Sequence, residues 1–166
     1  MSSVEREELM KVLVDVTHRI WRDMFQSGEA PRLVSSETVN RATEVLVAHV
    51  DIRGEWNGRI SCIGTPSTVH QLAQAVFGES MEIGDDRVRD CLAEITNVTG
   101  GNVKSALPGE CALSSPYVGV QADCLESKER RLQLSFSTLQ GPWSVILQWG
   151  LPDRVSHDLH SALSGE

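Results

Sequence analysis

The sequence predicts an α/β protein of the α+β type, in which a long N-terminal helix and two further helices pack on a mostly antiparallel sheet. Three stretches before residue 109 carry apolar residues at helical spacing. Strand-length stretches of alternating polarity lie between the first two helices and after the third. Because 166 residues with 40% hydrophobic content suit one well-cored unit, we expect a single domain over residues 1–166.

The chain opens with a predicted helix over about residues 3–26, which Ser27-Gly28 ends. This helix accounts for about residues 1–30 of the domain. Residues 28–43 contain Pro31 and are of mixed polarity, so we expect them to be a connection. The apolar residues that lie near one another on the helical wheel are Val4, Leu9, Val12, Val16, Ile20 and Phe25.

A β-hairpin and a second helix come next. Residues 44–53 alternate as a strand does, and a turn that contains two glycines leads into a second strand at 59–64. Thr65-Pro66-Ser67 then caps a helix over residues 66–77, and Gly78 ends this helix.

The third helix is predicted from Asp85 to Pro108, and it carries the residues on which the functional hypothesis depends. Acidic residues follow Gly84, where the helix dipole favours them, and Pro108-Gly109 cannot continue the helix. At about 100° per residue, the apolar residues gather on one side. Four residues fall within roughly 60° of each other on the other side, namely Asp90, Glu94, Asn97 and Gly101.

Two adjacent glycines inside this helix require an explanation, because each costs about 0.5–1 kcal/mol relative to alanine. The helix could break at Gly100 and a second short helix could follow. A neighbouring backbone could pack closely at Gly100-Gly101. Alternatively, a partner surface could approach beside Glu94 and Asn97, where side chains would obstruct it.

The chain after Pro108-Gly109 has β character. Strands are predicted at 117–125, 131–139 and 143–149. Apolar and polar residues alternate in the second of these, which is typical of a sheet with one face in water. The third strand places four apolar residues on one face, and residues from about 150 to 166 are expected to be a polar tail.

Composition limits the partners and the compartment. The formal net charge of -8 and the pI near 5.1 argue against nucleic acid or an anionic membrane as the main partner. A basic signal-peptide start and an apolar run of ~20 residues are both missing, so we expect a soluble, cytoplasmic protein without membrane insertion. Buried reduced thiols are expected at the four scattered cysteines, Cys62, Cys91, Cys111 and Cys124.

Ordinary catalytic and cofactor motifs are missing from the sequence. It contains no Gly-rich strand-to-helix loop, no P-loop and no G-x-S-x-G. His18, His49 and His70 have no adjacent nucleophile or acidic orienter that the sequence identifies. His157 and His160 are interpreted as surface residues of the tail, and the dispersed cysteines and histidines disfavour a zinc site. We therefore assign no metal ligand and expect no cofactor bound by this chain.

One run of the third helix resembles the signature of the CheC/CheX/FliY family of chemotaxis phosphatases: Asp90-x3-Glu94-x2-Asn97, followed by Gly101, Asn102 and Lys104, with Pro116 before a strand. The hairpin turn, the helix that starts at Pro66 and the junction before Pro116 also resemble the layout of that family. The resemblance covers roughly residues 40–150.

The sequence resembles the CheX branch more than the CheC branch. CheC proteins carry two such helices, whereas CheX proteins carry one and are typically dimeric. A second E-x-x-N occurs here at Glu37 to Asn40, but Leu33 stands where Asp would be expected and no glycines follow. We interpret this second match as a coincidence.

The resemblance implies a phosphatase that hydrolyses the aspartyl phosphate of a CheY-like response regulator. Glu94 would pair with the active-site Lys of the regulator, and Asn97 would orient the attacking water. A carboxamide suits that task because it accepts a hydrogen bond from water without bringing negative charge towards the phosphoryl group. Mg²⁺ is expected in the phosphorylated partner, and further partner-binding residues are expected at Asp90, Gly100, Gly101 and Lys104.

Two other function classes remain open at this point. The same polar helix face could dock a signalling partner without turnover, as a non-catalytic adaptor or binding module in two-component signalling. A domain that binds a small molecule or a metal is less favoured, because clustered ligands are missing. The resemblance also suggests a homodimer formed through the β part, although core packing explains the apolar face of residues 143–149 equally well.

Overall fold

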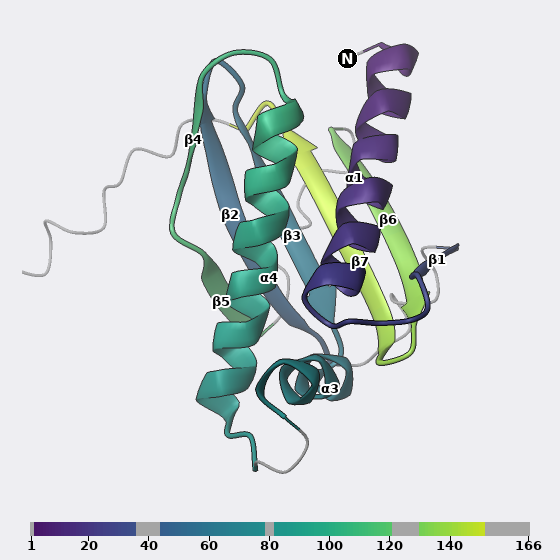
Figure 1. Cartoon of the computed structure of the whole chain (residues 1–166). Helices are drawn as coiled ribbons and strands as arrows, with labels where there is room; N and C mark the ends of the chain where they lie inside the picture. Colours follow the sequence, from purple (N-terminus) through teal and green to yellow (C-terminus); the bar gives the residue numbers. More distant parts are fainter. Residues whose placement is uncertain (1, 36–43, 79–81, 121–129, 152–166) are drawn as a thin grey trace, which may run out of the picture.

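The computed structural model describes residues 2–35, 44–78, 82–120 and 130–151. Its elements follow the predicted order of helix, hairpin, two helices and a β region (Figure 1). In chain order they are α1 (Ser3–Asp23), β1 (Arg32–Val34), β2 (Leu46–Gly54), β3 (Gly58–Gly64), α3 (Pro66–Phe77), α4 (Asp85–Ala106), β4 (Cys111–Leu113), β5 (Tyr117–Val120), β6 (Arg131–Thr138) and β7 (Gly141–Trp149).

The seven strands found in the described residues form one antiparallel sheet. The strand order is β1-β6-β7-β3-β2-β4, and β5 pairs with β2 beside β4. The predicted hairpin is confirmed as β2 and β3, in which His49 lies opposite Ser61. The predicted α+β class is therefore confirmed, with a sheet that is antiparallel at every described pairing.

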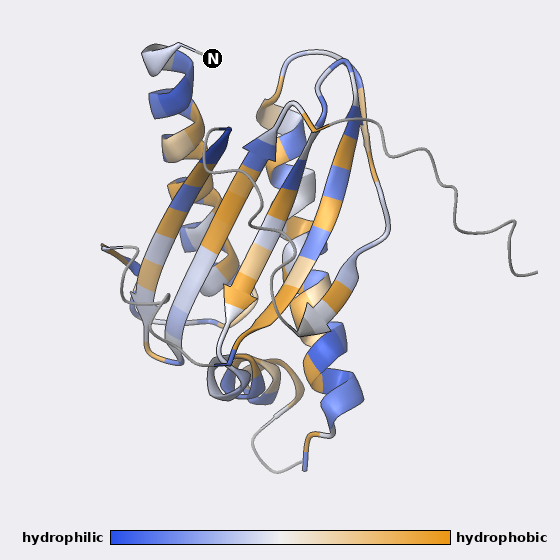
Figure 2. Cartoon of the chain, turned by 180° about the vertical axis from the view of Figure 1, so that it is seen from behind, coloured by the Kyte–Doolittle hydropathy of each residue, from blue (hydrophilic) through white to orange (hydrophobic). Residues whose placement is uncertain are grey.

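Two helices cover one face of the sheet. Figure 1 shows α1 and α4 side by side on that face, with α3 at one end, and Figure 2 shows the opposite face of the sheet. The core lies between the helices and the sheet, where Trp21 of α1 meets Trp143 of β7 with ring centroids 5.4 Å apart. Burial of such large apolar side chains holds α1 and α4 to the same face.

Some predicted boundaries need correction. The connection predicted at 28–43 contains strand β1, which pairs with β6 through Arg32 to Val34. Three residues are too few for polarity to alternate visibly, so only the pairing with β6 identifies this strand. The distal part of the strand predicted at 117–125, the second E-x-x-N match and most of the polar tail lie outside the described residues.

The prediction that the strand at 131–139 has one face in water is wrong near the middle of β6. Ser135 and Ser144 lie opposite each other and are 2% and 0% exposed. Their hydroxyl oxygens are 2.7 Å apart, so each small polar group satisfies the other across the strands. The alternation of polar and apolar residues therefore does not predict the exposure of this face correctly.

The apolar face of β7 packs inside the chain. Trp143, Val145 and Leu147 are buried in the core, and Trp149 packs against the same cluster from a half-buried position. Intramolecular packing thus accounts for the residues on which a dimer through this strand would have depended. Among the described residues, no helix has the length and apolarity needed to cross a membrane.

Candidate functional site

Helix α4 has one face built for the core. It starts after Gly84, with Asp85 and Asp86 in its first turn, and it ends before Pro108. The hydroxyls of Thr96 and Thr99 bond to carbonyl oxygens four residues earlier, at 2.7 Å, so they are satisfied inside the core. The buried residues of the helix are Val88, Cys91, Leu92, Ile95, Thr96, Thr99, Gly100 and Val103.

The opposite face carries the predicted site. Asp90, Glu94 and Asn97 are all exposed, and Gly101 is half-buried. We call these four residues the polar ridge. Within the described part of the chain, neither Glu94 nor Asn97 forms a hydrogen bond or an ion pair, so both side chains remain available to a ligand. The structure thus brings together the carboxylate and the amide that the sequence placed one turn apart.

The two glycines of α4 have different environments, and the helix is continuous through both. Gly100 is buried, and a Cβ there would overlap the side chain of Val50 on β2. Its placement on the partner surface is therefore wrong: Gly100 packs α4 closely on the sheet. Gly101 has room, since the nearest atom to a Cβ would be Leu113 Cδ1 at 3.9 Å, and Gly101 remains in the polar ridge.

Lys104 lies two turns beyond Asn97, in the last turn of α4, where the helix dipole favours a cation. It is half-buried. Seven positions after Asn97, it falls on the same side of the helix. Lys104 therefore extends the polar ridge towards the C-terminal end of α4.

Arg19 of α1 neighbours this site, although its position was not predictable from the sequence. Its Nη1 donates to Oδ1 of Asn102 at 3.1 Å, and Nδ2 of Asn102 donates to the carbonyl oxygen of Val98 at 2.8 Å. The only sequence signal was an arginine on the polar side of an amphipathic helix. Which helix it would face depends on the packing of α1 against α4.

A kinked edge strand borders α4. Leu113 of β4 lies opposite Ile52, and Tyr117 of β5 lies opposite His49, so three residues of this strand face two of β2. This count is that of a β-bulge, which bends a strand locally. The bulge occupies the Ser-Ser-Pro junction that resembles the family layout. Arg89 of α4 ties the helix to the following strand, β5, by donating to the carbonyl oxygen of Val118 at 2.9 Å.

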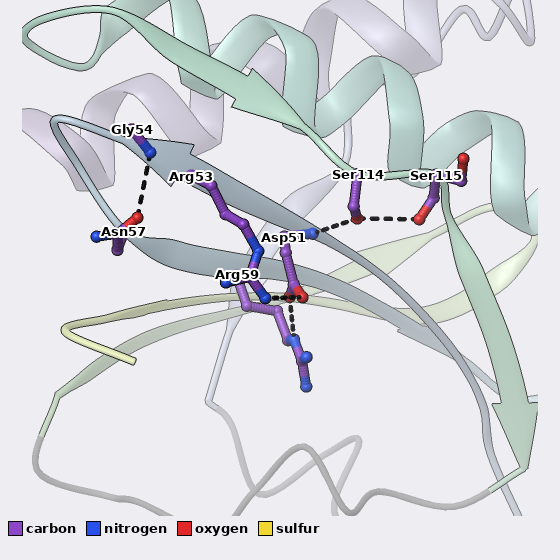
Figure 3. A network of polar contacts seen from close by, with 7 residues as sticks. All are labelled: Asp51, Arg53, Gly54, Asn57, Arg59, Ser114 and Ser115. Atoms are coloured by element: carbon purple, nitrogen blue, oxygen red, sulfur yellow. Dashed lines mark hydrogen bonds and ion pairs between the residues drawn. The ribbon is translucent and has the colours of Figure 1, made fainter. Parts of the chain in front are cut away.

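Ser114 holds the bulge to β2. Its backbone N–H donates to the carbonyl oxygen of Asp51 at 2.9 Å. Its Oγ accepts from the N–H of Asp51, also at 2.9 Å (Figure 3). The same hydroxyl donates to the carbonyl oxygen of Ser115 at 3.0 Å. The junction beside α4 is therefore fixed by hydrogen bonds although regular pairing is interrupted there.

Asp51 also anchors an ion pair on the helix-free face of the sheet. Its carboxylate accepts from Nε of Arg59 at 2.7 Å and from Arg53 at 3.3 Å (Figure 3). Burial alone would raise the pKa of Asp51, but the hydrogen bond and charge of Arg59 outweigh it and lower that pKa. Burial, reinforced by the charge of Arg59, lowers the pKa of neighbouring His49 to about 4.

The predicted buried thiols are confirmed at two positions. Burial raises the pKa of Cys62 and of Cys91 to about 11, and the charge of Glu94 adds to the shift at Cys91. Both thiols therefore stay protonated at neutral pH and are poor nucleophiles. Cys111 is half-buried, and Cys124 lies outside the described residues.

Comparison with known proteins identifies the family. A sequence profile described as "Chemotaxis phosphatase CheX" matches residues 46–137, more than half of the chain. The chain belongs to the CheX family of chemotaxis phosphatases. A search of curated proteins found no sequence match.

Solved structures of CheX and FliY proteins share the fold. Chemotaxis protein CheX from Vibrio vulnificus superposes with a TM-score of 0.70 at 17% identity, over 87% of this chain and 97% of that one. CheX in a complex with CheY, BeF3 and Mg²⁺ from Borrelia burgdorferi gives 0.63 at 18% identity, over 85% and 97%. FliY from Thermotoga maritima gives 0.61 at 12% identity, over 90% and 92%. The CheX family and its fold are thus assigned.

Proposed function

We propose that this CheX-family protein hydrolyses the aspartyl phosphate of a CheY-like receiver domain by inserting Glu94 and Asn97 into the active site of that domain. The observation that carries the proposal is the exposure of both side chains on one face of α4, without partners in the described part of the chain. Three positions apart on a helix, the two groups point in nearly the same direction. A single helix face could therefore deliver both at once.

The roles follow from the two functional groups. Asn97 can accept a hydrogen bond from water through Oδ1 and donate another through Nδ2, which fixes the water in line with the P–O bond. The water oxygen forms a bond to phosphorus as the bond to the aspartyl oxygen breaks. The products are the free carboxylate and inorganic phosphate, which carries both protons of the water until it releases one to solvent. Glu94 would contact a cation of the receiver, such as its active-site Lys.

The phosphorylated receiver would bring the metal. Mg²⁺ neutralises charge on a phosphoryl group during transfer, and the receiver carries this ion together with the phosphate. The polar ridge then needs only to position the attacking water and the receiver, and few functional groups suffice for that. The CheX protein from Borrelia burgdorferi, seen with CheY, BeF3 and Mg²⁺, supports this division of roles by analogy.

The test uses receiver domains from the same genome, phosphorylated with acetyl phosphate. The wild-type protein is expected to accelerate loss of phosphate from at least one of them. Asn97→Ala should keep the thermal stability of the wild type, since the side chain is exposed, and should lose about 10²-fold or more of the acceleration. Equal acceleration by the variant would contradict the proposal. Binding by the wild type without acceleration would instead establish the adaptor function.

A further inference from the structure

The guanidinium of Arg19, on helix α1, is held beside the polar ridge of α4. Arg19 is exposed on α1, and its guanidinium donates to Oδ1 of Asn102 on α4 at 3.1 Å. The other end of the same amide donates to the carbonyl oxygen of Val98 at 2.8 Å. Because both ends of the Asn102 amide are engaged, its orientation is fixed, and it holds the guanidinium against α4.

The position of this cation follows from the helix geometry. Val98 directly follows Asn97, and Asn102 lies one turn beyond Val98 on the side of α4 that faces α1. Figure 1 shows the two helices running alongside each other on one face of the sheet. The guanidinium therefore flanks the polar ridge at the level of its C-terminal half.

Arg19 keeps its charge available. In the part of the chain that the structure describes, it forms no ion pair. Asp23, one turn further along α1, is bound by Arg22 at 2.8 Å; this hydrogen bond is the main cause that lowers the pKa of Asp23, and the charge of Arg19 is the smallest. The guanidinium has five N–H donors, and its bond to Asn102 uses one nitrogen, so the rest can reach an anion.

Charge is therefore separated along the polar ridge. Asp90 and Glu94 lie on its N-terminal half, whereas Arg19 and Lys104 lie beside its C-terminal half, with Asn97 between them. The separation is notable in a chain whose formal net charge is -8. A partner that fits this surface would present a cation opposite Glu94 and an anionic surface opposite Arg19.

We infer that Arg19 is a docking residue for the anionic rim of the phosphorylated receiver domain, positioned for this purpose by Asn102. The inference rests on the proposed function, because the carboxylates that hold Mg²⁺ beside the phosphoryl group would provide the anionic rim. With the cation of the receiver at Glu94 and the phosphoryl group at Asn97, the surface next in line meets Arg19. Arg19 lies outside residues 46–137, so the family match does not include it. Arg19 affects the association rate and the affinity for the receiver, whereas Asn97 orients the attacking water.

The experiment compares matched charge deletions on α1 in the full chain. Arg19→Gln removes the proposed contact, and Arg19→Lys keeps the charge without the planar fork. Lys11→Gln is the control, since Lys11 is exposed two turns away on the same helix and is paired with Glu7 at 3.0 Å. KM and kcat are measured with an acetyl-phosphate-treated receiver that the wild type dephosphorylates, and Kd with the same receiver carrying BeF3 and Mg²⁺, each at low and high salt.

We expect Arg19→Gln to raise KM and Kd about three- to tenfold, with kcat within about twofold of the wild type. Its kcat/KM should depend less on salt. Arg19→Lys should recover part of the loss, and Asn102→Ala should weaken binding in the same direction. If Arg19→Gln behaves like Lys11→Gln while Asn97→Ala is inactive, the inference is overturned and the proposed function stands. If the wild type accelerates no receiver, both are overturned.

Discussion

Gly100 of α4 lies directly against Val50 of β2, and a Cβ on the glycine would overlap the valine side chain. Val50 is fully buried in the main core. The missing side chain lets α4 approach the sheet at this level, while Asn97, one turn earlier on the helix, stays exposed. The orientation of the polar ridge thus depends on a contact between residues 50 positions apart in the sequence.

Gly100→Ala is expected to destabilise the protein. Overpacking costs about 1–3 kcal/mol, and better helix propensity returns up to about 1 kcal/mol, so we expect a net loss of about 1–2 kcal/mol in the free energy of unfolding. Urea unfolding at one fixed pH measures it. The variant that also carries Val50→Ala should lose less than the sum of the two single changes. A Gly100→Ala protein as stable as the wild type would show that α4 does not need this close approach.

Gly101→Ala is expected to do the opposite. The nearest atom to the new Cβ, Leu113 Cδ1, would lie at 3.9 Å, an ordinary contact, so the gain in helix propensity of about 0.5–1 kcal/mol should appear as added stability. Because Gly101 belongs to the polar ridge, we also expect weaker binding of the BeF3-loaded receiver. Unchanged affinity would remove Gly101 from the partner surface, and lower stability would contradict the packing.

The elements with strong local signals were predictable. The bounds of α3 match the prediction because its signals are all local: Thr65 accepts a hydrogen bond from the N–H of Thr68 at 3.1 Å, Pro66 opens the helix, and Gly78 has a φ of 99°. The exposure of Glu94 and Asn97 also follows from helical periodicity alone. Both results need no knowledge of the rest of the chain.

The features that sequence analysis missed depend on distant parts of the chain. Strand β1 forms only because it pairs with β6, which lies about 100 residues later in the sequence. The assignment of Gly100 required the position of Val50, and the role of Arg19 required the position of Asn102. Burial of Ser135 required its partner on β7. Periodicity gives the face on which a residue lies, but tertiary packing decides what covers that face.

Glu94→Gln is expected to separate binding from turnover. The amide keeps the size of the side chain and removes the charge that would attract the cation of the receiver. KM should rise about three- to thirtyfold with a smaller change in kcat, because an interfacial charge contact acts mainly on association and affinity. Glu29→Gln, at an exposed position outside the helices, is the control for the loss of one carboxylate. A fall in kcat without a change in KM would instead place Glu94 in the chemical step.

The free energy of unfolding should fall as the pH drops from about 6.5 to about 4, in part because of His49. Burial lowers its folded-state pKa to about 4, whereas the unfolded chain titrates near 6.5. In this window the unfolded state binds more protons, so stability rises with pH and is fully present above about 6.5. Since His49 is only half-buried, we expect a contribution of about 1–2 kcal/mol. Urea unfolding of His49→Gln between pH 4 and 7 should show a shallower slope than the wild type, and equal slopes would show that His49 is not desolvated.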